Sequence, residues 1–319
     1  MTGPRTVGID VGGTKVLALI LGGGGAVEHE HRVPTPEGTD ALVDALADAV
    51  AKLTGTGPVE AVGVGVPGLV DRAGVLRTAP NLPGVTELPV RALLEERLGL
   101  PVQVDNDVTC AAWGERELGA GKGGDHVLVV ALGTGIGGGI ITGGQLYRGA
   151  NGFAGEFGHM VVDPSGPPCP CGQHGCWERF ASGSALGRFA REAAEGGRAT
   201  RILDLAGGDF HNVRGEHVAA AAREGDAEAT ALMARLGWWV GLGLANLVDA
   251  FDPATIVVGG GLLESADLFL DHARAAFADL VLAGPHRPSV AIVPAALGER
   301  AGAIGAALVA RDVLGDVKN

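Results

Sequence analysis

The segment 152–178 holds the residue types best suited to chemistry. Its three cysteines and one of its histidines lie close enough in sequence to converge on one ion: His159, Cys169, Cys171 and Cys176. Three thiolates and one imidazole form a closed tetrahedral set of the kind that zinc prefers, with no position left for a bound water. A zinc ion on these residues would therefore hold the segment in shape rather than take part in a reaction.

Two carboxylates flank this cluster: Glu156 lies three residues before His159, and Glu178 lies two residues after Cys176. A metal-bound histidine keeps a second ring N–H as a donor, so the segment predicts a polar wall suited to a polyhydroxylated molecule. One alternative is a zinc knuckle that only stabilises a long loop, with both glutamates solvated. A disulfide is less suitable, because Cys169 and Cys171 are too close for an easy bridge.

The composition indicates a globular protein of two domains or one large one. Of 319 residues, 46% are hydrophobic and 19% charged, and the net charge of -13 disfavours nucleic acid and anionic membranes as partners. Residues 1–5 carry no signal-peptide pattern, and the apolar runs look short and interrupted by glycine, so we expect no membrane-spanning helix. A cytoplasmic protein is expected, with Cys110 as a core residue.

The hydrophobic pattern predicts a mixed α/β fold that begins with an antiparallel meander. Strands are expected at 6–9, 16–21, 26–33, 59–66, 101–104, 127–132, 140–142, 255–258 and 290–293, and helices at 40–53, 88–98, 108–118, 184–194, 215–224, 226–248, 265–277 and 299–314. The glycine-rich run 119–124 suggests a boundary between a small domain, 1–119 with the closing helix 299–319, and a large domain, 120–298, which contains the zinc segment 159–176.

A glycine turn follows the first strand and contains Asp10, Gly12, Gly13, Thr14 and Lys15. Because glycine has no Cβ, the amides of such a turn can approach a phosphate closely. Asp10 at the strand end could hold a hydrated Mg²⁺. An ordinary tight turn that carries an aspartate is the alternative.

A second strand-glycine-strand hairpin contains Gly133, Thr134, Gly135 and Gly137. The pattern G-x-G-x-x-G matches there, but it requires a helix after the turn, whereas residues 140–142 look like a strand. The sequence therefore favours two phosphate-cradling hairpins, one in each half, that face each other across a cleft.

Polar residues also mark two other turns. Asn81 lies in a turn where its amide could face a ligand, and Asn106 and Asp107 follow the strand 101–104. Open α/β sheets bind ligands at the carboxyl ends of their strands. The alternative for Asp107 is the N-cap of the following helix.

Three motifs resemble the phosphate-1, phosphate-2 and adenosine motifs of actin-like sugar kinases, namely residues 10–15, 132–137 and 257–261. Together with Asn106, Asp107 and the cysteine-rich segment, they resemble the ROK family of repressors, open reading frames and kinases, and residues 149–160 resemble its bacterial glucokinases. The resemblance implies an α/β, two-domain, actin-like (ribonuclease H-like) sugar kinase fold with a central cleft, and ATP-dependent phosphorylation of glucose.

The resemblance also implies residue roles. Asp107 would be the general base, and the sugar would be bound by Gly68, Asn81, Asn106, Asp107, Glu156, His159 and Glu178. The ATP phosphates would lie at Asp10, Gly12, Gly13, Thr14, Lys15, Gly133, Thr134, Gly135 and Gly137, with Gly260 near the adenosine. Zinc would be structural, on His159, Cys169, Cys171 and Cys176, and Mg²⁺ catalytic.

Other readings within the family stay open: a kinase for fructose, allose or an N-acetylhexosamine, or a non-catalytic sugar sensor. The family's repressors carry a helix-turn-helix before the first phosphate motif, where this chain has only a few residues, so we expect no DNA binding. The family implies a homodimer or homotetramer. The pair at 299–300 is more charged than we expect there, but neither residue is expected to touch a catalytic contact.

Overall fold

A computed structural model describes residues 3–316 of the chain. The described residues form two compact units. The first unit contains residues up to 129, residues 138–155 and the chain from 295 onward, and the second contains residues 130–137 and 156–294. The sequence-based division kept 120–298 together, whereas this division assigns 120–129, 138–155 and 295–298 of that range to the first unit.

The first unit is built on a five-stranded sheet with the order β3-β2-β1-β4-β8. Its strands are β1 (Thr6–Val11), β2 (Lys15–Leu21), β3 (Val27–Pro34), β4 (Ala61–Val66) and β8 (Val102–Asn106). The first three are antiparallel neighbours, as the predicted meander requires, while β4 and β8 run parallel to β1. A small sheet of β5 (Leu69–Val70), β6 (Leu76–Thr78) and β7 (Thr86–Leu88) was not predicted.

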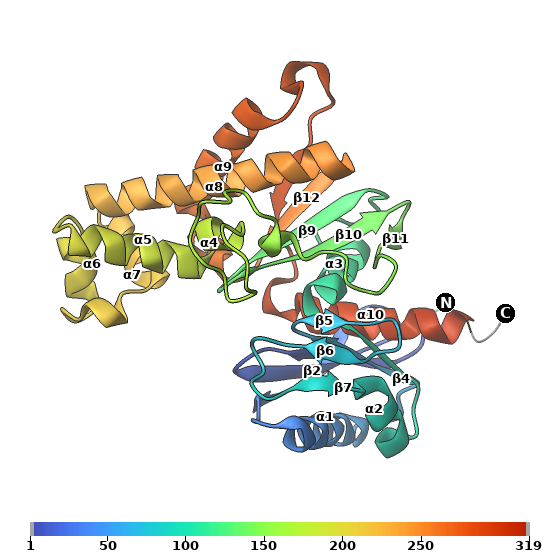
Figure 1. The fold of residues 1–319 in the computed structure, drawn as a ribbon. Coiled ribbons are helices and arrows are strands. Elements are labelled where there is room, and N and C mark those ends of the chain that lie inside the picture. Colours follow the sequence, from blue (N-terminus) through green and yellow to red (C-terminus); the bar gives the residue numbers. More distant parts are fainter. Residues whose placement is uncertain (1–2, 317–319) are drawn as a thin grey trace. The chain divides into compact units, whose positions relative to one another are not determined.

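Helices cover both faces of this sheet. Figure 1 shows α1 (Thr39–Thr54) and α2 (Val90–Leu98) on one face and α10 (Ala301–Asp316) on the other, next to α3 (Asp107–Leu118). Two strand glycines let α10 lie directly on the sheet. A Cβ on Gly8 would lie 1.9 Å from the carbonyl oxygen of Ala303, and one on Gly63 would lie 1.8 Å from that of Ala306. These glycines are therefore packing residues, since any side chain would push the helix away.

The second sheet has the order β11-β10-β9-β12-β13, with β9 (Val127–Leu132), β10 (Ile136–Thr142), β11 (Gln145–Leu146), β12 (Thr255–Gly259) and β13 (Ala291–Pro294). Strand β10 begins earlier than the predicted 140–142, so Gly137 and Gly139 lie in the strand rather than in the turn. The reason is packing, because a Cβ on Gly139 would lie 2.4 Å from the Cβ of Ala112 in α3.

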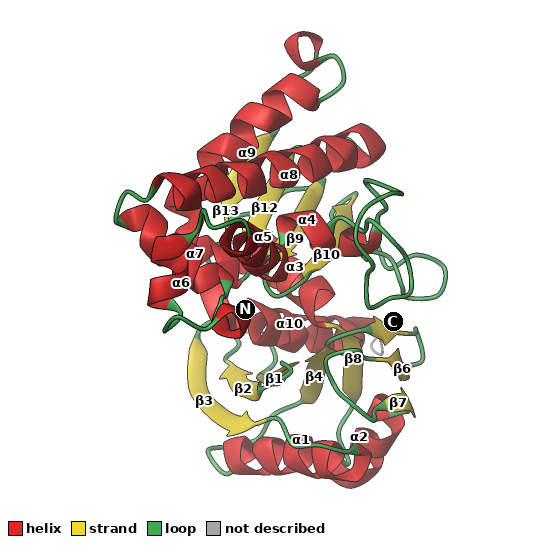
Figure 2. Ribbon diagram, turned by 60° about the vertical axis from the view of Figure 1, so that its left-hand side comes forward, coloured by secondary structure: helices red, strands yellow, loops and turns green. Residues whose placement is uncertain are grey.

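The second unit is mostly helical. Its helices are α4 (Glu178–Ala181), α5 (Gly183–Glu195), α6 (Thr200–Leu205), α7 (Gly215–Arg223), α8 (Ala227–Phe251) and α9 (Ala266–Leu280), of which α4 and α6 were not predicted. Short 3₁₀ segments lie at η1 (Phe157–His159), η2 (Phe210–Asn212), η3 (Gly261–Ser265) and η4 (Gly284–His286), and η5 (Gly298–Arg300) precedes α10 in the first unit. In Figure 2, α8 and α9 run side by side.

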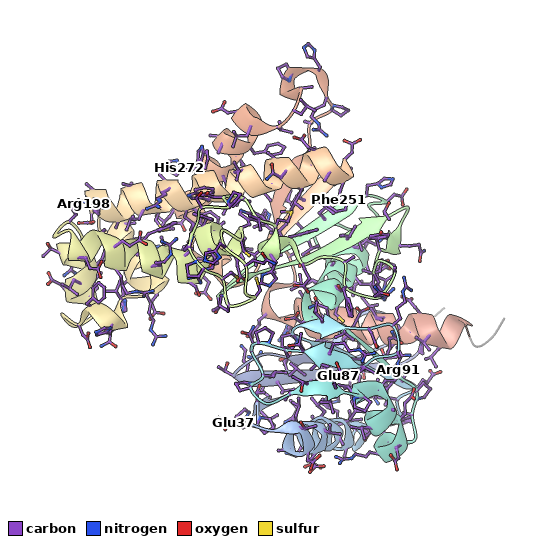
Figure 3. All side chains as sticks on the ribbon, viewed as in Figure 1. Glu37, Glu87, Arg91, Arg198, Phe251 and His272 are labelled. Atoms are coloured by element: carbon purple, nitrogen blue, oxygen red, sulfur yellow. The ribbon has the colours of Figure 1, made fainter. Side chains whose placement is uncertain are left out.

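Helix α8 corrects one expectation. It is 25 residues long and apolar enough to cross a membrane by length and composition, so the view that all apolar runs are too short was wrong. Its most apolar window is 61% buried inside the protein, and α9 packs on it, with His272 of α9 (Figure 3) against Gly237. Burial of this kind is typical of a core helix. The helix also exposes one large apolar side chain, because Trp238 is 44% exposed.

Candidate functional site

The first glycine turn connects β1 to β2 in the first unit. The amide of Gly12 donates to the carbonyl of Lys15 at 2.9 Å, and the Thr35 hydroxyl donates to the carbonyl of Gly12 at 2.6 Å, so the turn is held in a fixed shape. Asp10 is the penultimate residue of β1. Gly302 of α10 packs on its carboxyl group, because a Cβ on Gly302 would lie 2.6 Å from Cγ of Asp10. Burial raises the pKa of Asp10 to about 6, although the Lys15 ammonium opposes this shift.

Lys15 takes part in an ion-pair network that the sequence did not reveal. Its Nζ donates to Glu299 at 2.8 Å, and Arg32 donates to the other oxygen of the same carboxylate at 2.5 Å. These hydrogen bonds from Arg32 and Lys15 hold the pKa of Glu299 at about 2. Glu299 therefore contacts Lys15, one of the residues expected at the ATP phosphates.

Asn106 and Asp107 lie together where β8 passes into α3. Asn106 is the N-cap of the helix: its side-chain oxygen accepts from the amides of Val108 at 2.9 Å and Thr109 at 3.0 Å. Asp107 is the first helical residue and is half-buried, and one of its oxygens accepts from the Val108 amide at 2.9 Å. The capping role that we considered for Asp107 thus belongs to Asn106.

The remaining first-unit residues lie close to these two points. Asn106 donates from Nδ2 to the carbonyl of Gly68 at 3.2 Å. Gly68 has φ +102°, and a Cβ there would lie 2.2 Å from the carbonyl oxygen of Thr78, so only glycine fits. Asn81 is exposed beside the first glycine turn, with its carbonyl oxygen 3.2 Å from the point where a Cβ on Gly13 would lie.

The structure also shows charged groups here that we did not predict. Asp105 is only 4% exposed, and its carboxylate accepts from Nε of Arg148 at 2.6 Å. Arg72 donates to the carbonyls of Gly149 and Ala150. No motif pointed to either arginine, since both contacts join segments that are distant in the sequence.

In the second unit, the four predicted metal ligands converge. The ligand atoms of His159, Cys169, Cys171 and Cys176 all lie within 4.8 Å of one another. The sulfurs of Cys171 and Cys176 are 3.6 Å apart, close to the spacing of about 3.8 Å expected of two ligands at a tetrahedral zinc with Zn–S bonds of about 2.3 Å. All four cysteines of the chain are free thiols, so the disulfide alternative is not observed.

Both predicted carboxylates lie beside this cluster. Nε2 of His159 is 3.9 Å from Glu156, whereas its Nδ1 lies 3.8 Å from the sulfur of Cys169 and 4.0 Å from Glu178. Burial raises the pKa of Glu156, and His159 opposes the shift. Glu178 also reaches the second glycine turn, because a Cβ on Gly135 would lie 2.6 Å from its carboxylate oxygen.

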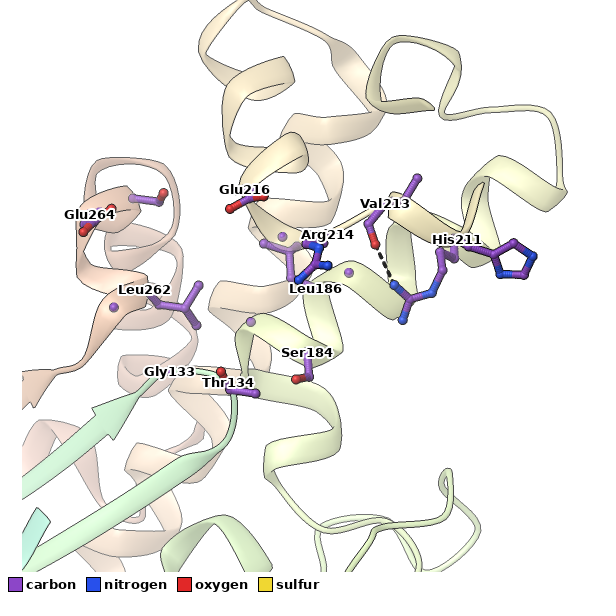
Figure 4. Close-up of a pocket in the computed structure, with 16 residues that line it drawn as sticks. Gly133, Thr134, Ser184, Leu186, His211, Val213, Arg214, Glu216, Leu262 and Glu264 are labelled. Atoms are coloured by element: carbon purple, nitrogen blue, oxygen red, sulfur yellow. Dashed lines mark hydrogen bonds between the residues drawn. The ribbon is translucent and has the colours of Figure 1, made fainter. Parts of the chain in front are cut away.

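The second glycine turn borders a cavity of about 510 Å³ that lies wholly in the second unit (Figure 4). Thr134 lines it from the turn, Ser184 from the first turn of α5, Arg214 from the start of α7, and Leu262 from η3. Gly260, which has φ +87°, precedes this last segment, and a Cβ there would lie 2.3 Å from the carbonyl oxygen of Leu132. The sequence had indicated the two glycine segments but not the lining from α5 and α7.

Arg191 fixes one wall of this cavity. Its Nη1 donates to the carbonyl of Val213 at 2.6 Å, the bond drawn in Figure 4, and so ties α5 to the segment before α7. The turn itself is closed by a bond from the Gly133 amide to the carbonyl of Gly135 at 2.9 Å, and the Gly183 amide donates to the carbonyl of Gly133 at 2.8 Å. The cavity thus has a rigid glycine rim next to a helix start.

Comparisons with known proteins give one consistent family. A family model described as "ROK family" matches residues 6–313. A glucokinase from Streptomyces coelicolor is 43% identical over 96% of this chain and 98% of its own length.

Solved structures agree with this match. The structure of a ROK family glucokinase from Streptomyces griseus, in complex with glucose and AMPPNP, is similar with a TM-score of 0.86 and 42% identity over 97% of this chain and 99% of that one. A ROK hexokinase from Thermus thermophilus gives a TM-score of 0.85 and 37% identity over 98% of this chain and 99% of that one.

Proposed function

The chain belongs to the ROK family, with its two-domain, actin-like α/β fold, and we propose that it is an ATP-dependent glucokinase that phosphorylates the 6-hydroxyl of glucose. The observation that carries this proposal is the position of Glu178. Its carboxylate lies against the Cys₃His cluster on one side and against the second glycine turn on the other. A hydroxyl-binding acid and a phosphate-binding turn are thus joined in one unit, as a sugar kinase requires.

The sugar-binding role rests on the chemistry of the side chains. In the second unit, Glu156 and Glu178 supply acceptors for hydroxyl groups, and the N–H of His159 that faces Glu156 supplies a donor. In the first unit, Asn106 keeps one N–H beyond its bond to Gly68, and the exposed Asn81 adds an amide. Each set of groups is suited to a neutral polyol, because it offers several hydrogen bonds.

Asp107 is the residue that we assign as general base. It accepts the proton of the 6-hydroxyl as that oxygen forms its bond to the γ-phosphorus, while the bond from the γ-phosphorus to the bridging oxygen breaks and ADP leaves. The capped start of α3 fixes the Asp107 backbone, so the carboxylate needs little reorganisation. Charge on the transferred group is stabilised by the amides of the two glycine turns.

The cavity of about 510 Å³ is the site that we assign to the adenosine. Its size is in the range of ordinary small-molecule sites, and its lining combines apolar Leu262 with polar groups from α5 and α7. Thr134 on its rim belongs to the second phosphate turn, so a nucleoside in the cavity would place its phosphates at that turn.

Two metal ions fit the residues present. Mg²⁺ takes oxygen ligands with several waters, and the Asp10 carboxylate at the end of β1 can hold it there and so lower the charge on the phosphates. Zn²⁺ fits the converging Cys₃His set, where it would fix the segment that carries Glu156 and Glu178. We also propose a cytoplasmic homodimer or homotetramer, as the family resemblance implies.

The proposal is tested by ADP release from Mg·ATP with a panel of hexoses, using the wild type, Asp107→Ala and Asp107→Asn. We expect turnover on glucose and a loss of about a thousandfold in kcat in both variants, because each lacks the base while sugar binding persists. Near-normal turnover in Asp107→Ala would contradict the role of the base.

Two other outcomes decide between the alternatives. Turnover on fructose, allose or an N-acetylhexosamine instead of glucose would keep the mechanism and change the substrate. Binding of a sugar without turnover on any hexose would favour the non-catalytic sensor. The presence of Asp107 and of both phosphate turns favours the kinase over the non-catalytic sensor.

A further inference from the structure

The buried ion pair beside the proposed base has no role in the reaction as described so far. Asp105 is the residue before Asn106 in β8, and it is 4% exposed. Its Oδ2 accepts from Nε of Arg148 at 2.6 Å, and its Oδ1 accepts from the amide of Asn106 at 3.0 Å. One carboxylate thus joins the arginine to the peptide that leads into Asn106 and Asp107.

The contacts continue from this peptide to the base. Asn106 uses its oxygen to start α3 and its Nδ2 to hold Gly68, so its position fixes the first turn of the helix. Asp107 is the first residue of that turn. A shift of Asp105 would therefore be passed through Asn106 to Asp107 without any intervening flexible segment.

The charges that act on the thiol of Cys110 also involve Arg148. Cys110 of α3 is buried, and burial raises its pKa; the carboxylates of Asp105, Asp10 and Asp107 raise this pKa further, while Arg148 opposes them. The three carboxylates thus act on the Cys110 thiol with the same sign, and Arg148 acts against them. Removal of one partner from a buried pair leaves the other charge uncompensated, which is costly.

Arg148 also begins a tightly held loop. The Ala154 amide donates to the Arg148 carbonyl at 3.2 Å, and Arg72 holds the next two carbonyls of the loop. A Cβ on Gly152 would lie 2.5 Å from the carbonyl oxygen of Val70. The backbone of Arg148 is thus fixed, and its side chain starts from a fixed point when it reaches Asp105.

We propose that Arg148 is a positioning residue for catalysis: through Asp105 it fixes the carboxyl end of β8, and with it the place of the base Asp107. This inference rests on the proposed function. It predicts that the ion pair affects turnover of the sugar and not only the stability of the fold.

The test compares four variants by kcat, by the KM values for glucose and ATP, and by the free energy of unfolding. Arg148→Met should lower kcat by about 10- to 100-fold, because a displacement of about 1 Å of a reacting group costs about that much. The KM for ATP should not change. Arg148→Lys keeps the charge but not the rigid fork, and it should recover part of the loss.

The double variant Asp105→Asn/Arg148→Met separates positioning from charge balance. It removes both charges, so the free energy of unfolding should return toward that of the wild type, whereas kcat should stay low. A double variant with wild-type kcat would overturn the inference, because the pair would then only balance charge.

Arg72→Met is the matched control, since Arg72 holds the same loop without contact to Asp105, and we expect it to lower kcat much less than Arg148→Met does. An equal loss of kcat in Arg72→Met would assign the effect to the loop and overturn the inference. Asp107→Ala is assayed in parallel. If it retains turnover, the proposed function fails; if it is inactive while Arg148→Met turns over normally, only the role of Arg148 fails.

Discussion

At the scale of single residues, Glu299 controls the charge beside the first phosphate turn. Its carboxylate accepts from both Lys15 and Arg32 and so offsets their positive charge. This site is solvent-exposed, with half of the Glu299 side chain accessible, so the ion pairs themselves add little to stability. Their consequence is the local potential that an anionic ligand meets.

We therefore expect Glu299→Gln to lower the KM for Mg·ATP severalfold at low ionic strength, because Lys15 and Arg32 lose the carboxylate that they share. The effect should shrink as salt is added, since exposed charges are screened. Steady-state kinetics at two salt concentrations measure the change in KM and its dependence on salt. Glu96→Gln, the same charge change at an exposed position of α2, is the control and should leave this KM unchanged; an equal change there would show that only net charge matters.

Asp10 gives a prediction of pH dependence. The pKa of Asp10 is about 6 in the folded protein, against 3.8 for an ordinary aspartate, so between these two pH values the folded state binds more protons than the unfolded state. The free energy of unfolding therefore falls as the pH rises through this window, by about 3 kcal/mol at most, and stays level above it. Asp10→Asn should remove this fall, which leaves the variant more stable than the wild type at pH 7 and equal to it below about pH 4.

Urea unfolding across this pH range, in buffer without Mg²⁺, measures the difference between the two proteins. Asp48→Asn, at an exposed carboxylate of α1, should show no such difference from the wild type. Mg²⁺ at millimolar concentration should stabilise the wild type more than Asp10→Asn. An unchanged difference on adding Mg²⁺ would contradict the role of Asp10 as a metal ligand.

Residue types and spacing predicted the convergence of the cysteine and histidine side chains, but not the supporting contacts. The ligands His159 and Cys176 are near in sequence, so a local motif predicts that they converge. The partners of Asp105 and Lys15 are distant in the sequence, and a charged side chain on a strand or loop does not indicate which opposite charge it will meet.

At the scale of elements, the glycines in the strands set how closely the helices pack. The pattern predicted β1, β4 and α10, but it could not show that Gly8 and Gly63 are where α10 lies against the sheet. The short strands β5 to β7 and the helices α4 and α6 were missed because segments this short contain too few residues to show a clear hydrophobic period.

Gly63→Ala tests this packing. The new methyl group would lie 1.8 Å from the carbonyl oxygen of Ala306, which is helix backbone and cannot rotate away. We expect a loss of about 3 kcal/mol or more in the free energy of unfolding, as for severe overpacking in a core. Urea denaturation measures it.

Gly24→Ala is the matched control for this change. A Cβ on Gly24 meets nothing within 4 Å, and its φ lies outside the left-handed region, so stability should be unchanged or rise by up to about 1 kcal/mol. A Gly63→Ala protein as stable as Gly24→Ala would mean that α10 does not need this close approach.

At the scale of the whole molecule, the chain divides its proposed binding sites between units that are built differently. The first unit offers Asp107, Asn106 and the first phosphate turn on a sheet covered by helices, whereas the second offers the metal cluster and the nucleoside cavity. The cavity is lined by none of the four predicted metal ligands. Metal binding and nucleotide binding should therefore be separable.

Cys171→Ser tests that separation. Loss of one of four zinc ligands should remove the metal, and Glu156 and Glu178 should then lose the anchor that fixes them. We expect weaker glucose binding by about 10- to 100-fold, while AMPPNP binds nearly as well as to the wild type. Metal content by mass spectrometry and both affinities by calorimetry provide the readout.

Cys110→Ser controls for the loss of a thiol, because Cys110 is a buried cysteine of the first unit, outside the cluster, and this variant should keep its zinc. Two results would contradict the prediction for Cys171→Ser. A metal-free variant that binds glucose normally would show that the glutamates need no anchor. Equal losses of glucose and AMPPNP affinity would show that the cluster supports the whole second unit, and the contact of Glu178 with Gly135 is the route by which the cavity rim would then be disturbed.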